Sequence, residues 1–107
     1  MKVVLERYVC NYHNMVDTYK NLTSDMDELQ YMNLESIVKG ITEVYNNTQT
    51  KVQQIIKLSW WDDNNHTENV IADVMGISEL TLRHAKEVIL KRVAKTVDYV
   101  RSMIKVL

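Results

Sequence analysis

Residues 68–87, ENVIADVMGISELTLRHAKE, are the stretch of this 107-residue chain that says most about its fold. Ile71, Ala72 and Met75 recur at helical spacing and predict one apolar helix face. Gly76 follows directly, where the C-terminus of a helix favours a residue that tolerates positive φ. The pattern therefore predicts a helix that ends in a sharp turn at Gly76.

A second helix is predicted immediately after this turn. Ser78 is a good N-cap, and Glu79 in the first turn is favoured by the helix dipole. Leu82, Ala85 and Ile89 continue an apolar stripe. Four side chains are expected to face away from that stripe: Glu79, Arg83, His84 and Lys86. This arrangement is typical of a helix-turn-helix, whose second helix enters the major groove of DNA, although an ordinary helical hairpin with solvated charges has the same pattern.

Composition favours one small, mostly helical domain. The chain has no proline, two glycines and 25% charged residues. No run of about 18 apolar residues exists, so we expect no transmembrane helix. Glu6 and Arg7 interrupt what would be the apolar part of a signal peptide, and the single Cys10 cannot form an internal disulfide. We therefore expect a cytoplasmic protein in which Cys10 is a small packing residue.

The net charge of −1 hides an uneven distribution. Residues 1–50 hold four basic and seven acidic side chains, whereas residues 78–107 hold seven basic and three acidic ones. Positive charge thus gathers on the second helix of the motif and its extension. Phosphate binding needs this pattern, and a solvated helix face also shows it.

The N-terminal half predicts two helices. Residues 2–22 carry an apolar stripe at alternating spacings of three and four: Leu5, Tyr8, Tyr12, Met15, Tyr19 and Leu22. This helix is interpreted as a core helix, an oligomer seam, or a mixture of both. A break is expected at residues 23–25, with Ser24 as N-cap of a second helix that runs from about residue 25 to 46. Gly40 within that helix predicts either a close helix crossing or a kink.

The central segment is predicted to be a buried helix. Thr50 and Gln53 have the spacing of a capping box at its start. Trp60 and Trp61 at its end are interpreted as core anchors rather than as a surface that stacks nucleic-acid bases. The polar stretch 62–66 contains two aspartates and a histidine but no fixed scaffold, so no metal site is predicted there.

The last segment meets no helix breaker between Ser78 and the C-terminus. A helix over residues 79–107 would be about 43 Å long, which is longer than a helix-turn-helix needs. Its distal half is expected to pack on the N-terminal helix or on another subunit. The predicted fold is all-α, a single domain over residues 1–107 with about five helices. Residues 1–48 are expected to serve packing or oligomerisation, and residues 50–107 to form the helix-turn-helix part with a long last helix.

The stretch 37–97 resembles the sigma-factor region-4-like domain of small phage transcriptional regulators of the RinA and ArpU type. The resemblance lies in IIKLSWW, a short polar gap, and IADVMGISELTLRHAKEVILKRVAKTV. LERYVCNYHNMVDTYKNL is also similar to the N-terminal helix of that group, with its spaced tyrosines. The resemblance implies a DNA-binding activator of phage late or packaging genes, and it leaves open a contact with RNA polymerase.

Candidate DNA contacts follow from this resemblance and from the chemistry of the side chains. Five residues lie at or near the start of the reading helix, where side chains reach base edges: Ser78, Glu79, Thr81, Arg83 and His84. Arg83 is suited to pair with guanine O6 and N7. Thr67, at the N-terminus of the first helix of the motif, is expected to hold a phosphate, as are Lys86 and Lys91.

Three functions stay open at this point. The first is a sequence-specific transcription regulator, expected to be a homo-oligomer and most simply a dimer. The second is a phage small terminase-like packaging subunit, which also joins a helix-turn-helix to helical oligomerisation segments. The third is a helical adaptor without DNA contact, which the acidic first half favours. No catalytic triad, phosphate loop or metal constellation stands out, so neither an enzyme nor a cofactor is predicted.

Overall fold

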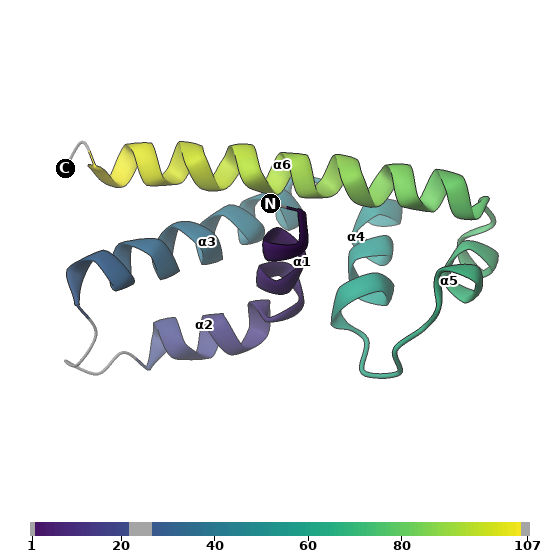
Figure 1. Ribbon diagram of the computed structural model, residues 1–107, viewed down its shortest axis with the longest axis horizontal. Coiled ribbons are helices and arrows are strands. Elements are labelled where there is room, and N and C mark those ends of the chain that lie inside the picture. The colour runs from purple at the N-terminus through teal and green to yellow at the C-terminus, as the bar shows by residue number, and fades with distance from the viewer. Residues whose placement is uncertain (1, 22–26, 106–107) are drawn as a thin grey trace.

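The computed structural model describes residues 2–21 and 27–105, and within these ranges it contains helices and no strand. The elements are α1 (Lys2–Cys10), α2 (Tyr12–Lys20), α3 (Glu28–Asn46), α4 (Thr50–Ile56), the π-helical turn η1 (Lys57–Trp61), α5 (Glu68–Met75) and α6 (Glu79–Lys105). In Figure 1 the last helix, α6, runs the length of the molecule and the other helices lie along one side of it. The predicted all-α class is therefore confirmed. Among the described helices, none combines the length and the apolar character that crossing a membrane requires.

The distal half of α6 packs against α3 (Figure 1). The two helices approach so closely at Gly40 that a Cβ added there would lie 2.5 Å from Val97 Cγ2 and 3.1 Å from Val97 Cα. The close crossing predicted from Gly40 is therefore confirmed, and α3 continues through this residue to Asn46. The distal half of α6 is expected to be covered by the N-terminal helix or by another subunit. The first alternative is wrong, because α3 covers this half of α6 instead.

The prediction of one continuous helix over residues 2–22 is wrong, because the structure has two helices there, α1 and α2. The chain turns at Asn11, where φ is −90° and ψ is 8°, and α1 and α2 point in different directions (Figure 1). A contact distant in sequence accompanies this turn: the indole N–H of Trp61 donates to the carbonyl of Val9, at 2.8 Å, a backbone oxygen that a continuous helix would use itself. Val9 is 1% exposed, whereas its neighbour Cys10 lies on the surface, so the packing role expected for Cys10 is also wrong.

Two helix starts differ from the prediction. The α3 N-cap is Asp27, which forms a capping box with Gln30, and the helix begins at Glu28 rather than near residue 25. The expected N-cap, Ser24, and the expected break at residues 23–25 lie outside the described residues. At the start of α4, the capping box of Thr50 and Gln53 is absent, because the Gln53 side chain donates instead to the carbonyl of Tyr45, at 2.8 Å.

The core lies between α6 and the shorter helices. Its buried apolar members among the described residues are Val9, Ile37, Ile41, Val44, Ile55, Ile56, Trp60, Ile71, Ala72, Leu82, Ile89, Leu90, Val93 and Val97. Trp60 is 8% exposed, and Trp61 packs against this core with its ring stacked on Tyr12 at a centroid distance of 5.2 Å. The interpretation of both tryptophans as core anchors is therefore confirmed. One side of α6, from Leu82 to Val97, contributes to this core.

Candidate nucleic-acid interface

The junction of α5 and α6 has a defined local geometry. Gly76 has φ 69°, the left-handed conformation that ends α5. The N–H of Ile77 donates to the carbonyl of Ala72 at 3.0 Å, and that of Gly76 donates to Asp73 at 3.2 Å. These two bonds form a Schellman motif, which satisfies carbonyls that the helix end would otherwise leave free. The turn expected at Gly76 is therefore present.

The start of α6 is fixed by its own side chains. Ser78 Oγ accepts a hydrogen bond from the N–H of Thr81 at 3.0 Å, as an N-cap does, and donates one to Thr81 Oγ1 at 2.8 Å. Both residues and Glu79 between them are exposed. The first turn of α6 is therefore pre-formed and open to a partner, although the two hydroxyls already contact each other.

Glu68 links the two helices by binding two cations of α6. Its Oε1 accepts from Arg83 Nε at 3.0 Å, and its Oε2 lies 3.4 Å from Lys86 Nζ. The hydrogen bond from Arg83 and the nearby charge of Lys86 lower the pKa of Glu68 below its usual range, and the same pairing raises the pKa of Arg83. Two cations expected at the DNA surface are thus neutralised in part by a carboxylate of α5.

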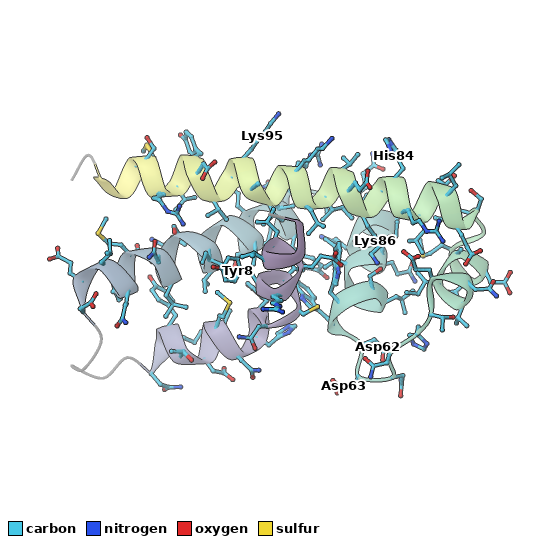
Figure 2. The ribbon with its side chains drawn as sticks, in the orientation of Figure 1. Tyr8, Asp62, Asp63, His84, Lys86 and Lys95 are labelled. Atoms are coloured by element: carbon cyan, nitrogen blue, oxygen red, sulfur yellow. The ribbon has the colours of Figure 1, made fainter. Side chains whose placement is uncertain are left out.

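Lys86 does not face away from the apolar stripe, so that expectation is wrong. Its side chain is 17% exposed, and its ammonium group lies 5.6 Å from the centroid of the Trp60 ring. Figure 2 shows Lys86 on the side of α6 that faces α4, whereas His84 and Lys95 point away from the bundle. Burial between Trp60 and Glu68 removes Lys86 from the surface where a DNA backbone would lie.

The outward face of α6 carries an open row of basic side chains. His84, Lys91 and Lys95 are all exposed, and their spacings of seven and four place them on one side of the helix. Lys95 was not among the predicted site residues, although the same periodicity in the sequence would have identified it. The row extends the candidate interface along α6, away from the turn at Gly76.

The predicted site residues do not all meet in one place. Ser78, Glu79 and Thr81 share the first turn of α6, and Arg83 and His84 lie about one turn further along. Thr67 is the N-cap of α5, where its Oγ1 accepts from the N–H of Val70 at 3.3 Å. The eight residues of α5 separate Thr67 from the turn by about 12 Å. Any phosphate at Thr67 would therefore belong to a different part of the interface.

The polar stretch between η1 and α5 makes local contacts. Asp62 accepts a hydrogen bond from the N–H of Asn64 at 2.9 Å, and its other oxygen lies 3.0 Å from His66 Nε2. Both contacts, the first more strongly, lower the pKa of Asp62. Within residues 2–21 and 27–105, no three His, Cys, Asp or Glu side chains are grouped as metal ligands. Asp62 and His66 are therefore held by contacts within their own loop.

Comparison of this chain with protein-family models, with curated proteins and with solved structures finds no match in any of the three.

Proposed function

We propose that the chain binds double-stranded DNA through α5, the turn at Gly76 and α6, and that it regulates transcription in the cytoplasm of a bacterial or phage-infected cell. The observation that supports this most is the exposed row of His84, Lys91 and Lys95 on the helix that follows the turn at Gly76. The resemblance of residues 37–97 to RinA- and ArpU-type regulators favours the same function. Recognition of the major groove by an exposed helix that follows a tight turn is the usual mode of such motifs.

The roles of the side chains in this proposal differ. His84 is exposed near the start of α6 and is proposed to contact base edges, and the exposed Lys91 and Lys95 are proposed to contact phosphates. Arg83 contacts Glu68 through Nε, so its two terminal nitrogens are the atoms that would approach guanine O6 and N7. Lys86 is given no DNA contact in this proposal, because its side chain is mostly buried.

The test is binding of the full chain to a pool of random duplexes at low and increasing salt, followed by selection of bound sequences. The double variant Lys91→Gln/Lys95→Gln should weaken binding to every duplex and reduce the salt slope by about 2, because two phosphate contacts are lost. The matched control is Lys39→Gln/Lys51→Gln, which removes the same charge from exposed positions on α3 and α4. Equal binding by the two double variants, or no binding by the parent at low salt, would overturn the proposal.

The adaptor function has one observation in its favour. Val70, Val74 and Leu80, on α5 and in the first turn of α6, are 45%, 65% and 75% exposed. Apolar side chains at this end of the molecule suit a protein partner better than a phosphate backbone.

Light scattering of the free chain distinguishes the regulator from the packaging subunit. A dimer fits a regulator of a palindromic site, and a ring of eight or more subunits fits a packaging subunit.

A further inference from the structure

A groove of about 460 Å³ lies beside α6, and its lining includes none of His84, Lys91 and Lys95. Its lining comes from the end of α3, the loop to α4, α4 itself and the proximal half of α6: Val44, Asn47, Thr48, Gln49, Val52, Ala85, Val88, Ile89 and Arg92. The volume falls within the range of small-molecule sites, which are mostly apolar with a few polar groups. The groove therefore has the size and the composition of a ligand site.

The polar residues of the groove come from two elements, the loop between α3 and α4 and the helix α6. Five members are apolar side chains, while Asn47, Thr48 and Gln49 form a polar loop segment and Arg92 supplies the one charge among the lining residues. Within the described part of the chain, no hydrogen bond or ion pair ties the guanidinium of Arg92, in contrast to Arg83 on the same helix. An unpaired guanidinium beside an apolar floor favours a ligand with an anionic head and an apolar body.

The composition of the lining favours a small molecule over a bound helix. Along α6 the lining runs from Ala85 to Arg92, a rise of about 10 Å. A helical peptide anchored at i, i+3, i+4 and i+7 spans the same distance, but its last apolar anchor would meet the charged Arg92. A carboxylate on a short aliphatic or aromatic body spans the distance with its head at Arg92.

We propose that this groove binds an amphipathic monocarboxylate, with Arg92 holding the carboxylate and the apolar body lying over Val52, Ala85 and Val88. The proposal goes beyond DNA binding and does not depend on it, because the groove lining includes none of His84, Lys91 and Lys95. Arg92 forms charge-assisted hydrogen bonds to the two carboxylate oxygens.

The test is titration of the isotope-labelled full chain with 2-naphthoate, followed by NMR of its backbone amides. Saturable shifts are expected at residues 44–52 and 85–92. Arg92→Gln should weaken the binding by about tenfold, because a charged hydrogen-bond pair is lost. The control Lys20→Gln removes an equal charge from an exposed position on α2, which contributes no residue to the groove, and should bind as the parent does.

Two further measurements distinguish binding at a specific site from non-specific apolar binding. The neutral isostere 2-naphthalenemethanol should bind at least about tenfold more weakly than 2-naphthoate, since it lacks the anionic head. Ala85→Leu should abolish binding, because the larger side chain occupies the groove. Leucine is also a strong helix former, so α6 should remain intact. Equal affinities of alcohol and acid, unchanged binding by a folded Arg92→Gln or Ala85→Leu protein, or shifts spread over the whole chain would each overturn the proposal.

Discussion

Gly40→Ala tests the contact between α3 and α6, on which the position of the whole C-terminal helix depends. The new Cβ would lie 2.5 Å from Val97 Cγ2 and 3.1 Å from both Cα and N of Val97. Carbon atoms pack best at about 3.5–4.0 Å, so the Val97 methyl must move by about 1 Å and the two backbones by a few tenths of an ångström. Rotation of the Val97 side chain relieves the first clash but not the second.

The expected change is a net loss of stability. Overpacking of a core costs about 1–3 kcal/mol, and alanine recovers about 1 kcal/mol through its better helix propensity. We therefore expect Gly40→Ala to lower the free energy of unfolding by up to about 2 kcal/mol. Val97→Ala alone should cost about 2 kcal/mol for two lost methyl groups. In the Gly40→Ala background it should cost about 1 kcal/mol less, because it removes the clashing Cγ2.

The assay is urea unfolding, followed by far-ultraviolet circular dichroism and by the fluorescence of Trp60 and Trp61, so that coincident transitions establish two-state behaviour. The control is Asn33→Ala at an exposed position of α3, which tests helix propensity without the crossing and should stabilise slightly. If Gly40→Ala were as stabilising as that control, and its effect were independent of Val97, the close crossing of α3 and α6 would be refuted.

Two further predictions concern the junction of α5 and α6. Gly76→Ala should lower stability by about 1 kcal/mol, and Gly76→Asn by less, because φ is 69° while the added Cβ meets nothing within 4 Å; equal unfolding midpoints for parent and alanine variant would contradict a left-handed residue there. Glu68→Gln should destabilise the chain by about 1 kcal/mol at neutral pH. Since the pKa of Glu68 is lowered in the fold, this difference is fully present above its ordinary value of 4.5 and shrinks as pH falls through the folded value. A difference that persists unchanged in acid, measured by urea unfolding across pH, would rule out the pairing with Arg83 and Lys86.

The local features of the fold were predictable from the sequence because their causes are local. A glycine after an apolar face specifies the Schellman turn at Gly76, and Ser78 caps the helix that follows. The stripe through Leu82, Ile89 and Val93 identifies the buried side of α6, since its period depends only on helix geometry. These features required no knowledge of the rest of the chain.

The features that escaped prediction depend on contacts distant in sequence. The turn at Asn11 accompanies the hydrogen bond from Trp61 to Val9, 52 residues away, and periodicity carries no record of such a bond. The inward position of Lys86 likewise depends on Trp60 and on Glu68, which lies 18 residues away. Long side chains cover apolar surface with their stems, so a charged residue near an apolar stripe is not necessarily a surface residue.

This distinction changes how the basic charge of α6 bears on function. A count of basic residues treats Arg83 and Lys86 as equal to Lys91 and Lys95, yet only the last two extend the outward face without a carboxylate partner among the described residues. A phosphate that approaches Arg83 must compete with Glu68, whereas one that approaches Lys91 displaces only water and salt ions. The proposed DNA surface therefore draws its affinity from the middle of α6 and its orientation from the turn at Gly76. It follows that base selectivity near Arg83 and overall affinity near Lys91 are separable, and that substitutions at the two positions should affect different properties of the same complex.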